Sequence, residues 1–250
     1  MSTNIQYDLM SHKLVIIPTY NEIENIEKVL RNIFSQSVDF DILVVDDSSP
    51  DKTWALVQEL QEEFKNRLHL EIRKSKSGLG KAYLHGFRWA LERSYDYIFE
   101  MDADFSHNPN DLIRLYNTCV KDDFDMSIGS RYIKGVNVVN WPMKRVLLSW
   151  LASKYVKIIT GLPIEDTTAG FICYHRKVLE DIDLNKIKFV GYAFQIEMKF
   201  KAYKKGFKIK EIPVIFTDRT KGKSKMNTGI IKEAVFGVMS LKLKSLLGKI

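Results

Sequence analysis

The chain has 250 residues, of which 45% are hydrophobic, and this length and composition suit one large domain with an ample buried core. Its two cysteines, Cys119 and Cys173, lie far apart and outside any metal-ligand spacing, which argues against a disulfide framework and against a zinc site. The first ten residues lack a basic segment followed by an apolar one, so we expect no signal peptide and a reducing, cytoplasmic location.

Short apolar runs alternate with segments of helical periodicity through the first half of the chain. Residues 14–17 and 42–45 are wholly apolar, which is typical of parallel strands buried on both faces. Further strands are expected near residues 68–72, 97–99 and 125–129. Helices are expected over residues 23–34, from about residue 51 onward, and over residues 81–93 and 109–121. This repeated β-α-β order predicts an open, mostly parallel α/β sheet.

Two candidate amphipathic helices follow this alternation. Four basic residues interrupt the apolar residues of segment 143–160, so it suits either a helix packed on the sheet or one at a membrane interface, and not a span. In segment 229–250 the longest uncharged run is 234–241, which is too short to cross a bilayer. We therefore predict a domain over residues 1–228 and a C-terminal basic amphipathic helix over residues 229–250.

The net charge of +7 comes from the C-terminal part of the chain. Residues 206–250 contain ten Lys or Arg and three Asp or Glu, whereas the preceding residues are balanced. This asymmetry indicates an anionic partner, either a phosphate-bearing ligand or an anionic membrane surface. Nucleic acid is disfavoured as a partner because the basic segment lacks interleaved aromatic residues and no recognition motif accompanies it.

Polar clusters follow three of the expected strands, at residues 18–22, 46–51 and 102–104. In open parallel sheets, ligands bind beyond the carboxyl ends of the strands. Asp102 and Asp104 provide the carboxylate oxygens that a hard divalent cation prefers, although acidic pairs are also common in surface turns. A turn would have to be invoked three times, whereas a single ligand crevice explains all three clusters.

These clusters belong to a longer series of motifs, at residues 17–22, 44–51, 78–82, 101–107, 129–132, 166–171 and 191–198. By their order and spacing, residues 13–228 resemble the polyprenyl-phosphate sugar transferases of glycosyltransferase family 2, and among them the dolichyl-phosphate mannosyltransferase type. The resemblance implies a GT-A fold, which is Rossmann-like, with flanking helices and C-terminal amphipathic helices. It also implies a nucleotide-sugar donor and a divalent metal, Mg or Mn.

The resemblance assigns donor-binding and metal-binding roles to the clustered residues. Those expected to line the nucleoside pocket are Pro18, Tyr20, Glu22 and Asp46. Asp102 is expected near the ribose and diphosphate, and Asp104 is expected to bind the metal. Some relatives have Gln where this chain has Ser106, so either Ser106 or a water completes the coordination. For His107 we expect a supporting or helix-start role, because hard ions favour oxygen ligands.

Basic residues are expected to neutralise the phosphates of both substrates. Negative charge develops on a nucleotide diphosphate as the glycosidic bond breaks, so nearby cations lower the barrier. Arg219 and Lys225 lie in a glycine-containing loop that the resemblance implies closes over the donor. Arg131, Arg145 and Ser149 are the candidates for the acceptor phosphate, since Arg binds phosphate bidentately and the last two share a helical face. An alternative is that Arg145 only snorkels from an amphipathic helix.

A phosphomonoester acceptor is already anionic at neutral pH, because its second pKa is about 6, and so it needs no general base. The hypothesis is in-line transfer of mannose, with inversion, from GDP-mannose to a dolichyl-type polyprenyl phosphate. Asp104, Arg131 and Arg145 would carry the catalysis by positioning and charge neutralisation.

Two alternatives remain open from sequence. A related transferase could use UDP-glucose or another UDP-sugar, since the pocket residues do not fix the base or the sugar. A noncatalytic nucleotide-sugar-binding subunit is the other alternative, although it would not need both a metal site and an acceptor site. We expect peripheral attachment at the inner face of the membrane through segment 143–160 and the basic C-terminal helix, or anchoring by an integral membrane subunit.

Overall fold

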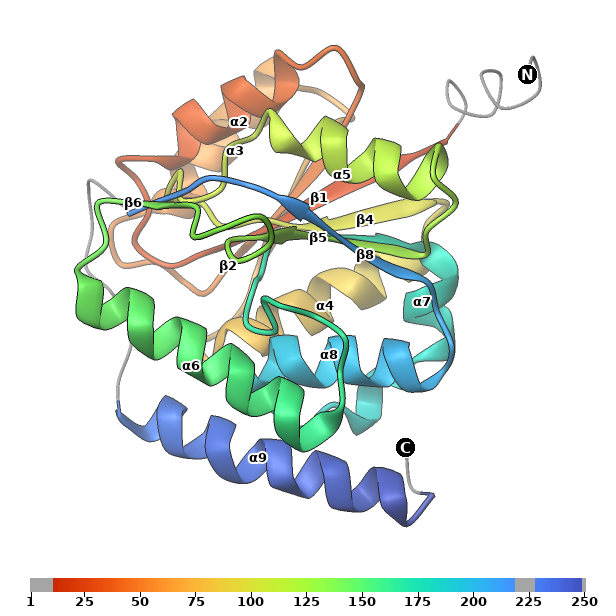
Figure 1. Ribbon diagram of the computed structural model, residues 1–250. Helices are drawn as coiled ribbons and strands as arrows, with labels where there is room; N and C mark the ends of the chain where they lie inside the picture. Colours follow the sequence, from red (N-terminus) through yellow and green to blue (C-terminus); the bar gives the residue numbers. More distant parts are fainter. Residues whose placement is uncertain (1–10, 219–227, 249–250) are drawn as a thin grey trace.

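A seven-stranded sheet forms the centre of the protein, with strand order β3-β2-β1-β4-β7-β5-β8 (Figure 1). The computed structural model describes residues 11–218 and 228–248. The strands of this sheet are β1 (Lys13–Thr19), β2 (Asp41–Asp46), β3 (Leu68–Ile72), β4 (Tyr97–Glu100), β5 (Met126–Ser130), β7 (Ile172–His175) and β8 (Ile209–Pro213). A second, two-stranded sheet pairs β6 (Val138–Val139) with β9 (Phe216–Thr217) in parallel.

The strands of the central sheet run parallel with the exception of β7. Strand β7 is antiparallel to both of its neighbours, and Ile172 at its start lies opposite both Glu100 and Ile128. The prediction of a mostly parallel α/β sheet is confirmed, while β7 and β8 were not predicted. As a result, the carboxyl ends of β1, β2, β4 and β5 meet the beginning of β7 at one edge of the sheet.

The wholly apolar strands have both faces covered, as their sequence indicates. Every residue from Leu14 to Ile17 is fully buried. Leu14 and Ile16 belong to one hydrophobic cluster and Val15 and Ile17 to the other, because successive strand residues point to opposite faces. The sheet therefore separates two cores.

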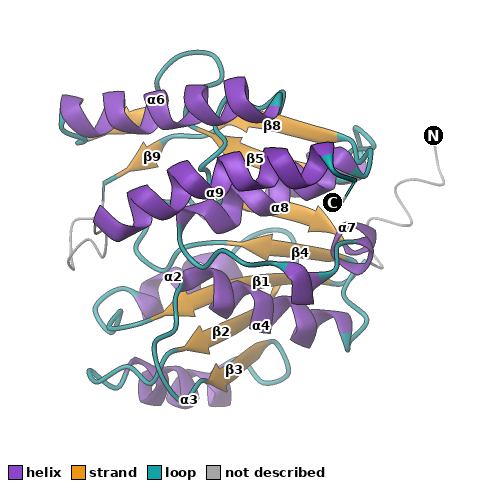
Figure 2. Ribbon diagram, turned by 90° about the horizontal axis from the view of Figure 1, so that it is seen from below, coloured by secondary structure: helices purple, strands orange, loops and turns teal. Residues whose placement is uncertain are grey.

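Helices cover both faces of the sheet (Figures 1 and 2). One face carries α2 (Ile26–Phe34), α3 (Thr53–Glu63) and α5 (Asp111–Val120). The other carries α4 (Leu79–Leu91), α7 (Arg176–Asp181), the short 3-10 helix η1 (Leu184–Lys186) and α8 (Tyr192–Lys204).

Helix α2 begins three residues later than predicted. Ile23, which was expected at its start, has 41% of its surface exposed. The backbone N–H of Glu22 donates to Thr53 Oγ1 at the start of α3, at 3.0 Å, and that of Ile23 donates to Asp51 Oδ2 in the loop between β2 and α3, at 3.2 Å. These bonds to a neighbouring segment hold the chain in turns, so the helix starts only at Ile26.

Helix α9 (Thr228–Leu246) lies below both α8 and α6 (Met143–Thr160) in Figure 1, and it covers α8 in the view of Figure 2. Helices α6 and α9 pack on each other and on α8 through a small apolar cluster, consisting of Val156, Ile196, Phe200, Val238 and Leu241. Both helices also expose apolar side chains at helical spacing: Met143, Leu147, Leu151 and Ile158 on α6, and Phe236, Met239, Leu243 and Leu246 on α9. Among the described helices, none is long and apolar enough to cross a membrane. The predicted domain division at residue 228 stays a prediction.

Candidate active site

Asp46 joins the first two polar clusters at the ends of β1 and β2. Its carboxylate is fully buried and accepts hydrogen bonds from Thr19 Oγ1 at 2.7 Å and from Ser49 Oγ and N at 2.6 and 2.8 Å. The Asp47 N–H also donates to the Thr19 carbonyl at 3.1 Å. Asp46, predicted to line a nucleoside pocket, thus fixes the backbone that surrounds the end of these strands.

The first cluster lies beside the segment that follows β3. Pro18 and Tyr20 are half-buried and Glu22 is buried, where its Oε2 accepts from Asn25 Nδ2 at 3.3 Å. The Lys76 ammonium lies 4.2 Å from the centre of the Tyr20 ring. Of the three residues in this cluster that are predicted to bind the donor nucleoside, Tyr20 therefore lies against a lysine of the segment after β3.

An ion pair that sequence reasoning missed supports this end of the site. Arg73, directly after β3, donates to both carboxylate oxygens of Asp47, at 2.5 and 2.8 Å. Both side chains are largely buried, with 13% and 8% of their surface exposed. The sequence hinted at this pair only through Asp47, which lies in the acidic motif after β2. Nothing near Asp47 in the sequence indicates that Arg73, at the end of the neighbouring strand, is its partner.

The Asp102–Asp104 segment forms a tight turn at the end of β4. Asp104 is buried and its Oδ1 accepts a hydrogen bond from the Ser106 N–H at 3.0 Å. Phe105 between them has a φ of 61°, in the left-handed region that non-glycine residues adopt mainly in turns. Local turn chemistry therefore brings two predicted metal ligands, Asp104 and Ser106, to the same turn.

His107 supports this turn from below as a neutral imidazole. Its Nδ1 accepts a hydrogen bond from the Asp102 N–H at 3.1 Å, which leaves the proton on Nε2. The ring stacks on Phe171 with centroids 4.7 Å apart and meets the edge of Phe216 at 5.4 Å. Burial lowers the pKa of His107 to about 4, so the ring is uncharged at neutral pH. This agrees with the supporting role expected from sequence.

The turn suits a divalent cation that also contacts a substrate. Asp102, Asp104 and Ser106 offer oxygen ligands, the kind that Mg²⁺ and Mn²⁺ prefer. Within residues 11–218 and 228–248, no group of three His, Cys, Asp or Glu residues could hold a metal by itself. Mg²⁺ usually takes one or two carboxylates and completes its shell with substrate phosphates and water, and this set of ligands fits that pattern.

Arg131, predicted to bind the acceptor phosphate, is held by a buried carboxylate. Its Nε and Nη2 donate to Asp166 Oδ2 and Oδ1, both at 2.6 Å, and its backbone N–H adds a third bond at 2.9 Å. Nη2 also donates to Thr168 Oγ1 at 2.8 Å. Burial opposes ionisation of Asp166, but the charge and hydrogen bonds of Arg131 lower its pKa below the ordinary value. Sequence reasoning noted Asp166 only as part of a motif.

Arg145 lies beside Arg131 on the same indole ring. The guanidinium carbon of Arg145 is 3.9 Å from the centre of the Trp141 ring and that of Arg131 is 5.4 Å from it. Arg145 Nη1 donates to Asp218 Oδ1 at 2.7 Å, and about 29% of its side chain is exposed. Ser149 follows one turn further along α6 and is half-buried. The structure thus brings together the two arginines that the sequence suggested, through a tryptophan that it did not.

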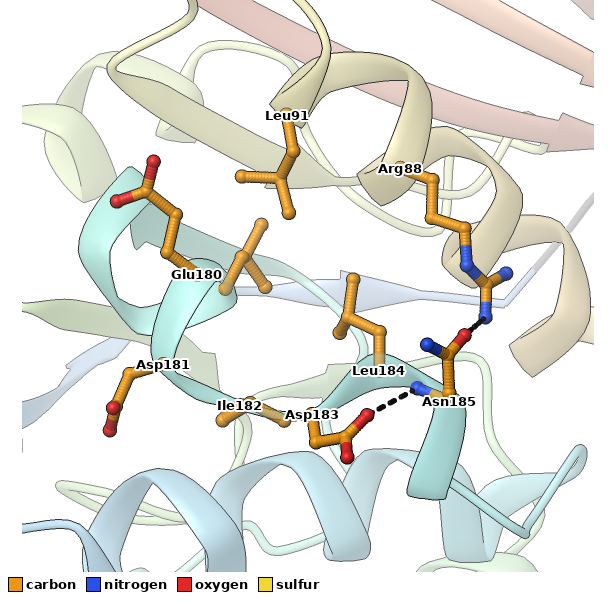
Figure 3. Close-up of a pocket in the computed structure, with 9 residues that line it drawn as sticks. Arg88, Leu91, Glu180, Asp181, Ile182, Asp183, Leu184 and Asn185 are labelled. Carbon is orange, nitrogen blue, oxygen red and sulfur yellow. Dashed lines mark hydrogen bonds between the residues drawn. The ribbon is translucent and has the colours of Figure 1, made fainter.

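Two of the residues predicted to bind the donor, Arg219 and Lys225, lie outside the described residues, and two cavities lie outside the three polar clusters. A cavity of about 530 Å³ opens between α4, α7 and η1, away from the strand ends (Figure 3), where Arg88 and Asn185 are hydrogen-bonded at 3.1 Å. A neighbouring cavity of about 390 Å³ lies along α4 and reaches Arg73, the partner of Asp47. Neither cavity is lined by residues 18–22, 46–51 or 102–104.

Comparison with known protein families identifies the class to which this fold and this candidate site belong. The model of the family described as Glycosyl transferase family 2 matches residues 14–183. The chain therefore belongs to glycosyltransferase family 2, as its motifs implied, and is a glycosyltransferase.

Curated relatives share almost the whole chain. Polyprenol monophosphomannose synthase of Mycolicibacterium smegmatis is 47% identical over 225 residues, which cover 90% of this chain and 84% of that protein. Undecaprenyl-phosphate mannosyltransferase of Micrococcus luteus is 45% identical over 227 residues, covering 90% and 91%.

Solved structures share the fold at low sequence identity. Glucosyl-3-phosphoglycerate synthase of Mycobacterium tuberculosis, in complex with Mn²⁺, UDP-glucose and phosphoglyceric acid, superposes with a TM-score of 0.67 at 14% identity, covering 96% of this chain and 82% of that one. A mannosyltransferase of Pyrobaculum calidifontis, in complex with GDP-mannose and Mn²⁺, gives a TM-score of 0.59 at 19% identity, covering 87% and 60%. The GT-A fold that the motifs implied is confirmed.

Proposed function

We propose that the protein transfers mannose from GDP-mannose to a dolichyl-type polyprenyl phosphate in a metal-dependent, inverting reaction. The observation that carries this proposal is the closeness of an acidic turn and an arginine pair at one edge of the sheet. The Phe216 ring centre lies 5.4 Å from that of His107, below the acidic turn, and 5.6 Å from the guanidinium carbon of Arg131. The Phe216 ring is therefore a common neighbour of the two halves, and their closeness is consistent with a transfer between two phosphate-bearing substrates.

The acidic half of the site, which consists of residues 18–22, 46–51 and 102–106, would bind the donor. We assign the nucleoside to Pro18, Tyr20, Glu22 and Asp46, the basic lid to Arg219 and Lys225, and the metal to Asp102, Asp104 and Ser106. A bound Mg²⁺ or Mn²⁺ would neutralise the diphosphate as it gains charge on leaving. The GDP-mannose and Mn²⁺ bound by the Pyrobaculum mannosyltransferase are consistent with this assignment, although that protein shares only the fold.

The arginine half of the site, which consists of Arg131, Arg145 and the residues that hold them, would bind the acceptor. Arg131, Arg145 and Ser149 are assigned to its phosphate, and the names of the two curated relatives support a polyprenyl phosphate and a mannosyl group. At neutral pH this phosphate is largely a dianion, so it attacks the anomeric carbon without a general base. Asp166 and Asp218 would orient the two guanidinium groups that receive it.

A transfer assay tests the proposal against both alternatives. Radiolabelled GDP-mannose, UDP-glucose and UDP-N-acetylglucosamine are each incubated with dolichyl phosphate and with undecaprenyl phosphate, with and without EDTA. We expect label from GDP-mannose in the lipid phase, lost with EDTA and restored by Mg²⁺ or Mn²⁺. A product with the β configuration supports inversion. Preference for a UDP-sugar would contradict the donor, and nucleotide binding without any transfer would favour a noncatalytic subunit.

We also propose that α6 and α9 attach the protein to the inner face of the membrane. Each helix exposes a stripe of apolar side chains, and these two packed helices are the ones that a lipid surface would cover. Basic residues such as Lys144 and Lys242 lie among the stripes and suit anionic lipids.

Flotation with vesicles tests this attachment. We expect binding to phosphatidylglycerol vesicles at low salt, and severalfold weaker binding for Leu243→Ser/Leu246→Ser. The control Lys28→Gln/Lys121→Gln changes α2 and the end of α5 on the other face of the sheet and should bind like the wild type. No flotation of the wild type at low salt would contradict the proposal and favour an integral anchor subunit.

A further inference from the structure

A partly buried loop, residues 165–170, carries the carboxylate that holds Arg131. It leads into β7 at the strand-end edge, and Asp166 and Thr167 in it are fully buried. At its beginning, the carboxylate of Glu211 on β8 accepts the backbone N–H groups of Glu165 and Asp166, at 2.7 and 2.8 Å. The Glu211 carboxylate therefore fixes the first end of the loop by accepting hydrogen bonds from its backbone N–H groups.

A buried lysine fixes the other end of the loop by donating hydrogen bonds to its backbone carbonyls. Lys199 on α8 is fully buried, and its ammonium donates to the carbonyls of Ala169, Thr167 and Gln195 at 2.5, 3.2 and 3.4 Å. An ammonium has three N–H donors, so these three carbonyls match its capacity. Burial lowers the pKa of Lys199 to about 8, which still leaves it mostly protonated at neutral pH.

Such a lysine is expensive to bury unless its hydrogen bonds are all made. Two of the three bonds go to carbonyls of the loop, those of Thr167 and Ala169, which follow Asp166 by one and three residues. Asp166 itself uses both carboxylate oxygens on Arg131. A continuous set of bonds therefore runs from Lys199 through the loop to the arginine.

We propose that Lys199 is a positioning residue for the acceptor phosphate, acting by clamping the 165–170 loop so that Asp166 presents Arg131. This inference rests on the proposed function, in which Arg131 binds that phosphate. A lysine that merely fastens α8 to the sheet would instead affect both substrates alike.

Gln195 provides a matched control on the same helix. It lies one turn before Lys199, is 3% exposed, and its side-chain amide donates to Glu100 at the end of β4, on the acidic half of the site. Substituting either residue by Met removes a buried hydrogen-bonding group from α8. The Gln195 side chain also lies next to Gly170, but only the Lys199 change removes hydrogen bonds from the 165–170 loop.

Steady-state kinetics with each substrate varied in turn form the first test. For Lys199→Met we expect the KM for the lipid phosphate to rise roughly tenfold, because the loop loses two charged hydrogen bonds, while the dissociation constant for the donor nucleotide changes less than about twofold. Gln195→Met should leave the lipid-phosphate KM within about twofold of wild type. Equal shifts of both substrates in Lys199→Met, or equal acceptor effects in the two variants, would overturn the proposal.

The Nε–H signal of Arg131, observed by NMR and assigned with Arg131→Lys, is a second readout that needs no substrate. It should move toward the position of solvent-exposed arginines in Lys199→Met and stay in place in Gln195→Met. Should Lys199→Met not fold, Glu211→Gln at the other end of the loop takes its place, with the same two readouts. Absence of lipid transfer in the wild type would refute the proposed function alone, whereas an unmoved Arg131 signal would refute the positioning role.

Discussion

The two halves of the strand-end edge are built by different means. In the acidic half, Asp104 is held by Ser106 two residues away and Asp46 by Ser49 three residues away. The more distant partners of this half, Thr19 of Asp46 and Arg73 of Asp47, lie at the ends of the neighbouring strands β1 and β3. In the arginine half, the partners of Arg131 and Arg145 are 35 and 73 residues distant. The first half is made by turns that follow strands, and the second exists only once β5, α6 and the segment after β9 have come together.

The largest effect is expected from Asp104→Ala, which removes a proposed metal ligand from the acidic half. Transfer should fall roughly a thousandfold, since metal-assisted charge neutralisation contributes several kcal/mol to the transition state. The unfolding midpoint should change little, because the turn keeps its other bonds. Single-turnover rates with and without added Mn²⁺ measure this, and Asp122→Ala on the surface is the control. Near-normal transfer by Asp104→Ala would show that the acidic turn does not bind the metal.

Asp166→Asn tests the arginine half in the opposite way, through stability. It leaves the Arg131 charge buried without its counterion, so the free energy of unfolding should fall by about 3–5 kcal/mol. Glu63→Gln breaks the exposed bidentate pair with Arg31, whose geometry is similar, and should cause a much smaller loss. Urea denaturation measures both.

The same pair predicts a dependence on pH. Since Arg131 lowers the pKa of Asp166, the contribution of this carboxylate is present above its ordinary value of 3.8 and is lost as pH falls below it. The difference between wild type and Asp166→Asn should therefore shrink in acid. A difference that stays constant down to pH 3 would mean that the buried pair is not what stabilises the native state.

This contrast also explains how far the sequence alone could lead. The runs 14–17 and 42–45 revealed their strands because both faces are apolar, and the acidic clusters marked the strand ends. Strand β7 lies in a short apolar run of its own, residues 171–174, but its antiparallel place between β4 and β5 depends on pairing across the whole fold and could not be predicted. For the same reason Arg131 could be proposed from its motif, whereas its partner Asp166, and the Trp141 ring shared with Arg145, required the structure.

Arg145→Ala should have a smaller and more selective effect than the first two changes. The Arg145 side chain is partly exposed and paired with Asp218, so its loss should hardly alter stability. We expect the KM for the lipid phosphate to rise roughly tenfold with the donor KM unchanged, because one charged phosphate contact is lost. Arg145→Lys keeps the charge without the fork and should recover part of the loss. An unchanged acceptor KM would favour the alternative that Arg145 only snorkels.

The smallest effect is expected from Thr19→Val, which removes one of three donors to Asp46 while keeping the shape of the side chain. The buried carboxylate retains its two bonds from Ser49, so the free energy of unfolding should fall by only about 1 kcal/mol. Thr118→Val is the control, since its hydroxyl bonds only to the Arg114 carbonyl within α5, and should cost less. If Thr19→Val proved as damaging as Asp166→Asn, the acidic half would depend on the contact between β1 and β2 as strongly as the arginine half depends on its distant partners. The distinction between a locally built half and a tertiary one would then fail.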